Sequence, residues 1–143
     1  MREILFRGKR KDNGEWIEGY FVYTKSDYDT EEEREADIIP HDADRVYTGE
    51  YNYAYPCIPE TVGQYTGLTD KNGQKIFEGD VLKNVMRWCE EERNGLVTFK
   101  DGAFGFIWHR GEVEMFHAFV SVVNIEYEVI GNINDNPELL EVK

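Results

Sequence analysis

The chain has 143 residues, of which 41% are hydrophobic and 14% aromatic, and its 29 acidic and 16 basic side chains give a formal charge of -13. This length supports one buried core, or two small lobes, but not two large independent domains. The negative charge excludes a protein that coats DNA, because such binding needs many Lys and Arg side chains at the phosphates. No apolar run reaches the roughly 18 residues of a membrane span, and the start MREILFRG lacks the pattern of a secretory leader, so we expect a cytoplasmic protein.

The first part of the chain predicts a β-hairpin. Strands are expected over Glu3–Phe6 and Glu15–Tyr23, with a turn at Asn13 and Gly14 between them. Asn-Gly is typical of hairpin turns because both residues tolerate positive φ.

A strongly acidic segment follows, from Asp27 to Asp37, with seven acidic residues and one basic residue. Like charges in such a block resist ordering, so we interpret it as a solvated connection between strands. Two alternatives stay open: a surface that mimics nucleic-acid phosphates or binds a basic partner, and a cation site at Asp27, Asp29 and Glu31. The calcium-loop pattern, with its central Gly and terminal Glu, is absent from this segment.

The next unusual stretch is a stripe of four tyrosines, at Tyr47, Tyr51, Tyr53 and Tyr55. On a strand, the last three would share one face. Alternate tyrosines offer a wide amphipathic contact area, so this stripe is our candidate surface for a second copy or another protein. The alternative is ordinary packing across a sheet, and no basic residues accompany the stripe as a nucleic-acid platform would require.

Two more hairpins are predicted in the second half of the chain. One joins strands 62–66 and 75–77 through a turn at Asn72 and Gly73, and the other joins strands 96–99 and 104–108 through residues 100–102. The step at Gly79 and Asp80 is interpreted as a tight turn, since both residue types favour turns.

The end of the chain predicts one strand and a short helix. Ile125–Ile130 alternates acidic and apolar residues, as a half-buried strand does, while Glu112–Val120 fits both a helix and a strand. At the C-terminus, Asn136 can cap a helix that begins at Pro137 and carries Glu138 in its first turn.

No catalytic, cofactor or metal motif is present in the sequence, so we expect a protein that is not an enzyme and holds no cofactor or metal. Asp80 could act as a general base with His117, but the turn interpretation of Asp80 is favoured. Cys57 and Cys89 have no metal-ligand spacing, and we expect both to be reduced in the cytoplasm.

Several short blocks occur in the same order as in a known family and together cover nearly the whole chain. They are Phe6–Lys9, Asn13–Ile17 with Gly19, Glu60–Leu68, Asp70–Gly73, Ile76–Val81, Val129–Asn132 and Asn136–Leu140. In these blocks the chain resembles the YopX family of phage and prophage proteins. The residues around Asp27–Asp37 and Trp88–Glu92 are expected to vary, so any role there belongs to this protein alone.

The resemblance implies a small phage-encoded protein that is mainly β, built of antiparallel hairpins, with a C-terminal part similar to an SH3-type barrel. It implies one unit over residues 1–143, with two lobes at 1–58 and 59–143 as the alternative. It assigns no catalytic residue.

Two functional hypotheses follow. The first is a non-enzymatic protein-interaction module, self-associating or bound to a phage or host protein, in the cytoplasm of the bacterial host. The second is an accessory in phage DNA metabolism, or an acidic inhibitor of a host DNA-binding protein. Direct nucleic-acid binding and membrane binding are both disfavoured, the first by the charge and the second by the absence of an apolar span.

Overall fold

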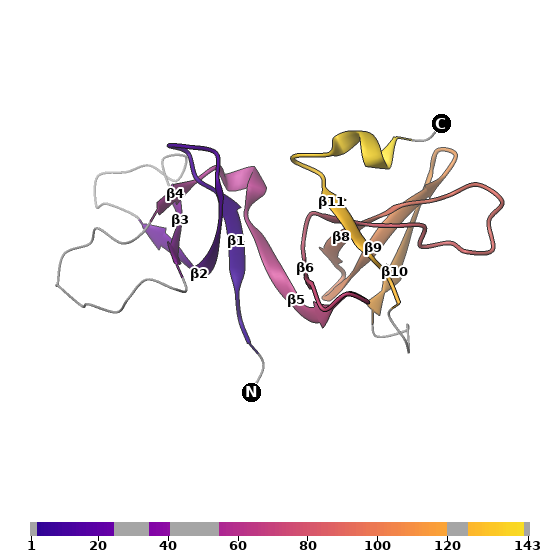
Figure 1. Cartoon of the computed structure of the whole chain (residues 1–143), viewed down its shortest axis with the longest axis horizontal. Helices are drawn as coiled ribbons and strands as arrows, with labels where there is room; N and C mark the ends of the chain where they lie inside the picture. The colour runs from indigo at the N-terminus through magenta and orange to yellow at the C-terminus, as the bar shows by residue number, and fades with distance from the viewer. Residues whose placement is uncertain (1–2, 25–34, 41–54, 120–125, 142–143) are drawn as a thin grey trace. The chain divides into compact units, whose positions relative to one another are not determined.

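The computed structural model describes residues 3–24, 35–40, 55–119 and 126–141 (Figure 1). The chain forms two units, Met1–Tyr65 and Thr66–Lys143, and passes from one to the other within strand β5 (Gly63–Thr69). The two-lobe alternative predicted from the sequence has its boundary between residues 58 and 59 instead. The described residues form antiparallel strands and short 3-10 turns, which confirms the prediction of a mainly β protein.

The first unit is an antiparallel sheet in the order β4-β3-β2-β1-β5. Its elements are β1 (Phe6–Lys9), β2 (Trp16–Thr24), β3 (Glu35–Pro40), β4 (Tyr55–Cys57), the 3-10 turn η2 (Pro59–Thr61) and the first half of β5. β1 begins at Phe6 and not at Glu3, and its pairing with β2 ends at Gly19, the residue at which β2 also begins to pair with β3 along its other edge. Leu5 and Cys57 are buried in this unit.

The second unit contains a five-stranded antiparallel sheet in the order β10-β9-β8-β7-β11. Its strands are β7 (Asp80–Leu82), β8 (Gly95–Lys100), β9 (Ala103–Arg110), β10 (Val113–Ala118) and β11 (Val129–Asn132), and the second half of β5 lies beside β6 (Lys75–Phe77). Its core consists of Ile76, Leu82, Val85, Met86, Val97, Phe106, Trp108 and Phe119. The segment 112–120, which the sequence left open, contains strand β10.

The hairpin turns differ in geometry from the expected one. Gly14 and Gly73 have φ of 70° and 80°, while the asparagine before each stays at negative φ, so these turns use only the glycine as a left-handed residue. In the β8–β9 turn, Asp101 and Gly102 both have positive φ, and Lys100 pairs directly with Ala103. This last turn is therefore the two-residue hairpin that the strand twist favours.

The predicted SH3-type barrel is not supported. Within the described part of the chain, β10 and β11 are the two edges of an open sheet and no pairing joins them. Turn residues specify which neighbouring strands pair, but closure depends on strands far apart in sequence. The predicted strand 125–130 begins only at Val129 among the described residues, because the carbonyls of Tyr127 and Glu128 accept isolated hydrogen bonds from Lys71 and Lys83 instead of forming a ladder.

The C-terminal helix predicted from the sequence does not form. Residues Pro137–Leu140 form a single 3-10 turn, η4, and Glu141 returns to extended backbone. The Asn136 side chain does not cap this turn. Its Oδ1 accepts the N–H of Asn132 at 3.4 Å, and it packs so closely against Gly131 that a Cβ at that glycine would lie 2.5 Å from the same oxygen.

One buried carboxylate joins three parts of the second unit. Asp70 is only 5% exposed and directly follows β5. Its Oδ1 accepts the N–H groups of Asn72 (2.8 Å) and Gln74 (2.9 Å) in the β5–β6 turn, and its Oδ2 accepts the N–H of Val129 on β11 at 3.1 Å. Burial works to raise the pKa of Asp70, but the three backbone donors and the charge of Lys71 outweigh it and lower the pKa.

We predict that Asp70→Asn lowers the free energy of unfolding by about 2 kcal/mol at neutral pH, because an amide cannot accept at both of its positions and leaves a buried N–H unpaired. The folded pKa of Asp70 lies below the value of about 3.9 for an unfolded chain, so its contribution is complete above that pH and is lost as the pH falls through the folded pKa. Urea titrations across this range should show the parent and the variant converging in acid. The exposed Asp101→Asn is the control, and equal stability of Asp70→Asn and the parent at neutral pH would contradict the prediction.

Candidate interaction site at the β7–β8 loop

The connection between β7 and β8 covers residues 83–94 and is the longest in the described part of the second unit. Loops of this length without regular structure are commonly functional. Asn84, the second residue of the loop, has a left-handed conformation, with φ of 41°. The chain therefore turns sharply away from the sheet at Asn84.

The base of this loop is fixed by hydrogen bonds and by the core. The N–H of Asn84 donates to Oδ1 of Asn94 at 3.0 Å, and the N–H of Val85 donates to the carbonyl of Arg93 at 2.7 Å. Val85 and Met86 are each only 2% exposed and belong to the hydrophobic core. The two ends of the loop are thus held together, which limits the motion of the residues between them.

Trp88 lies at the outer part of the loop and is 78% exposed. It borders a hollow of about 300 Å³ that is lined by Val85, Arg87, Trp88, Glu126 and Tyr127. A large aromatic side chain that is exposed beside a hollow offers a contact surface to a partner at low entropic cost.

The other side of the hollow is polar, and an ion pair and a hydrogen bond hold its side chains in place. Nη1 of Arg87 lies 3.5 Å from Oε2 of Glu126, and its Nη2 donates to the Glu126 carbonyl at 3.2 Å. The Tyr127 ring packs edge-on against Phe106 at 5.4 Å. Burial raises the pKa of Tyr127, with the charge of Arg87 acting in the opposite direction, so its hydroxyl keeps its proton at neutral pH.

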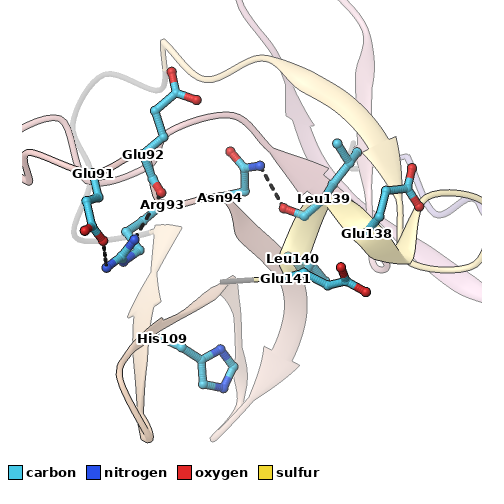
Figure 2. Close-up of a pocket in the computed structure, with 9 residues that line it drawn as sticks. All are labelled: Glu91, Glu92, Arg93, Asn94, His109, Glu138, Leu139, Leu140 and Glu141. Carbon is cyan, nitrogen blue, oxygen red and sulfur yellow. Dashed lines mark hydrogen bonds and ion pairs between the residues drawn. The ribbon is translucent and has the colours of Figure 1, made fainter. Parts of the chain in front are cut away.

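The opposite flank of the same loop forms an acidic groove of about 570 Å³ with the C-terminal turn (Figure 2). It is lined by Glu91, Glu92, Arg93, Asn94, His109, Glu138, Leu139, Leu140 and Glu141. Its arginine is already engaged, because Arg93 donates to Glu91 Oε2 at 2.7 Å and to the Glu92 carbonyl at 3.3 Å. The four glutamates therefore make the groove electronegative.

Asn94 connects this groove to the rest of the unit. Its Nδ2 donates to the carbonyl of Leu139 on η4 at 2.8 Å, as Figure 2 shows, while its Oδ1 accepts from Asn84. One amide thus positions the loop and the C-terminal turn, which are 45 residues apart in sequence.

The predicted tyrosine surface lies mostly outside the described residues. Tyr47, Tyr51 and Tyr53 fall there, and Tyr55 lies on β4. The guanidinium of Arg10 lies 4.0 Å from the centre of the Tyr55 ring and is also hydrogen-bonded to Asp12. This ion pair raises the pKa of Arg10 and lowers that of Asp12. A basic residue thus accompanies the tyrosine that is described, which the sequence did not indicate.

The structure places Asn13, Gly14, Asn72, Gly73 and Gly79 at or beside turns, whereas Asp80 is the first residue of β7. Asn13 Oδ1 accepts the N–H of Glu15 at 2.9 Å, next to Gly14. The backbone of Asn72 is bound by Asp70, and Gly73 follows it. Gly79 has φ of 88°, and Asp80 Oδ2 accepts the N–H of Phe77 at 2.8 Å.

The one acid–base pair considered from the sequence is not brought together. Asp80 is buried on β7, whereas His117 lies on β10, with β8 and β9 between the two strands. The His117 ring stacks on Phe106, with ring centres 5.5 Å apart. Cys57 and Cys89 are thiols, and no cluster of three or more metal-ligating side chains occurs among the described residues.

The sequence alone does not indicate the β7–β8 loop as a site. The available sign was a lone tryptophan among charged residues, Arg87-Trp88-Cys89-Glu90, where no alternation demands an apolar residue. Exposure of Trp88 depends on Val85 and Met86 taking the buried positions, which a linear pattern does not reveal.

Comparison with known proteins agrees with this fold. Residues 5–141 match the family described as YopX protein. The chain belongs to the YopX protein family. The matched range includes the whole β7–β8 loop and the residues of η4 that face it across the groove.

A solved structure is also similar to this chain. The crystal structure of protein EF1440 from Enterococcus faecalis has 26% sequence identity and a TM-score of 0.51, and the similarity covers 99% of this chain and 100% of that chain. Among curated proteins, none matches. No helix in the described residues is long and apolar enough to cross a membrane.

We predict that Asn94→Ala lowers the free energy of unfolding by about 1 to 3 kcal/mol, because it leaves the Asn84 N–H and the Leu139 carbonyl without their partner. Urea denaturation measures this loss, and limited proteolysis should show faster cleavage within residues 83–94. The matched control is Asn134→Ala, at an exposed turn. Equal stability of the Asn94 and Asn134 variants would show that the amide does not hold the loop.

Proposed function

We propose that this chain is a non-enzymatic protein-interaction module, encoded by a phage or prophage and active in the cytoplasm of the bacterial host. We further propose that Trp88 anchors its partner protein. The observation that carries the proposal is the 78% exposure of Trp88 on a loop whose base is fixed. Tryptophan is among the residues most enriched at the energetic centres of protein interfaces.

The rigidity of the loop base supports this function. Ordering a mobile loop on binding costs conformational entropy, which reduces affinity. Because Val85 and Met86 are already buried and the Val85–Arg93 hydrogen bond is formed, less of that cost remains when Trp88 is covered. The hollow beside Trp88 provides space for a side chain of the partner.

The electrostatics around the loop favour a basic protein surface as the partner. The groove on one flank of the loop carries Glu91, Glu92, Glu138 and Glu141, and the whole chain has a charge of -13. Such a surface attracts Lys and Arg side chains and repels nucleic-acid phosphates. Trp88 can also stack with a cationic side chain of the partner.

The placement of the titratable groups supports a non-enzymatic role. Asp80 is engaged in a turn and His117 is packed against aromatic rings, so neither faces the hollow or the groove. The groups around the loop are an exposed indole, a phenol, the His109 imidazole and the glutamates of the groove, a set suited to recognition of a basic surface.

We predict that Trp88→Ala weakens partner binding by at least about 2 kcal/mol, or roughly thirtyfold in Kd, as expected for an interface hot spot. Quantitative pull-downs from host lysate would compare the parent with Trp88→Ala and with Phe99→Ala. Phe99 is the control because it is an aromatic residue of the same unit that is 53% exposed and lies near the end of β8 that is farther from the loop.

A partner that is lost with Trp88→Ala and kept with Phe99→Ala supports the proposal, provided that both variants melt like the parent. Retention of all partners by Trp88→Ala contradicts it. Binding that is weakened equally by both variants also contradicts a site centred on Trp88.

A second candidate is an acidic inhibitor of a host DNA-binding protein. The four glutamates of the groove favour it, because a basic DNA-binding surface is the complement of such a lining. Duplex DNA should then compete with this chain for the captured partner, and affinity should fall steeply with added salt. An interface dominated by Trp88 should instead tolerate salt.

A further inference from the structure

Strand β10 forms one edge of the five-stranded sheet and, in the described part of the chain, has little of the protection usual for an edge beyond the charge of Glu114. Among the described residues, none pairs with its outer side from Val113 to His117. Natural edge strands are normally short, bulged or interrupted by Pro or by inward-facing charges. β10 instead pairs with β9 in an unbroken register over all its residues, Val113–Ala118, and contains no proline.

The two faces of this edge differ in character. On the inner face, Val113 is 58% exposed and Met115 is 37% exposed, and Met115 lies opposite the buried Trp108. On the outer face, Glu114 is the only charged residue of the strand, and its Oε2 lies 3.4 Å from Nζ of Lys100. The edge is therefore apolar and locally close to neutral.

Charge identifies the occupant that this edge fits. Two copies that each carry a charge of -13 repel across most of their surfaces. The β10 edge is locally close to neutral, because the lysine at position 100 offsets the one carboxylate on the strand, so pairing at this edge brings little direct repulsion. A basic partner, by contrast, would gain less electrostatic attraction at this edge than in the acidic groove.

We infer that two copies of this chain associate through β10, edge to edge and antiparallel, about a twofold axis. The faces of the two sheets remain continuous only if residues of the same face lie opposite each other. For the free stretch Val113–His117, the twofold axis then passes by Met115. In this register Val113 faces His117 of the other copy, and the two Met115 side chains meet.

This register avoids the unfavourable pairs that edge association could create. Glu114 lies opposite Phe116 of the other copy, so the two carboxylates are not directly opposed. The Met115 side chains extend the apolar row that begins at Trp108, which removes exposed apolar surface from water. The inference is independent of Trp88, which lies on the β7–β8 loop.

Cysteine cross-linking tests the register. In a Cys89→Ser background, with Cys57 fully buried, Met115→Cys should form a disulfide-linked dimer on mild oxidation, because each cysteine meets its own counterpart. Val113→Cys is the control, since it lies opposite His117 and should not link to itself. Cross-linking of Val113→Cys that equals or exceeds that of Met115→Cys overturns the proposed register.

Sedimentation equilibrium of the full chain tests the association itself. We expect a reversible dimer that tightens as salt rises, because screening weakens the repulsion between two acidic copies. Met115→Lys should weaken the dimer at least tenfold. Ile133→Lys is the matched control, because Ile133 has the same 37% exposure and follows the opposite edge strand β11. A monomer at sub-millimolar concentration in high salt, or equal effects of both lysines, overturns the inference.

Discussion

The second unit depends on a carboxylate that is buried away from water and satisfied by backbone N–H groups. Asp70 accepts hydrogen bonds from Asn72 and Gln74 within its own hairpin and from Val129 nearly sixty residues later. A carboxylate can bind several N–H donors at once, whereas a buried one without donors would be strongly destabilising. The same side chain thus shapes the β5–β6 turn and places β11, the strand that leads to the C-terminal turn and to one wall of the acidic groove.

The β7–β8 loop shows how a fixed structure can present an exposed aromatic residue. Val85 and Met86 bury their side chains in the core, and the Asn94 amide holds both the loop and η4. Trp88 lies between these anchors and the carboxylates of residues 90–92, where it adds nothing to the core. Its position on a well-anchored loop is the basis of the recognition role that we propose.

The antiparallel, mainly β architecture could be predicted from local chemistry. The strands around Trp16–Tyr23, Lys75–Phe77 and Phe104–Trp108 follow from alternating apolar residues bounded by Asn-Gly and Asp-Gly turns. Where the prediction was wrong, a distant contact decided the outcome. β1 starts late because its pairing with β2 extends only to Phe6 and Gly19, and the C-terminal helix is a single 3-10 turn whose expected cap, Asn136, packs against Gly131 instead.

By itself, the sequence determined the class of the fold, the places of the hairpin turns and the membership of the YopX family, because each depends on residues close together in the chain or on their order. Only the tertiary structure decided that the sheet of the second unit is open between β10 and β11, and that Trp88 is exposed while its neighbours are buried. It also decided that the glutamates of the loop and of the C-terminus line one groove. These features arise from contacts between residues 39 to 59 positions apart, such as Arg87–Glu126 and Asp70–Val129, and no local pattern encodes which distant partner a side chain will meet.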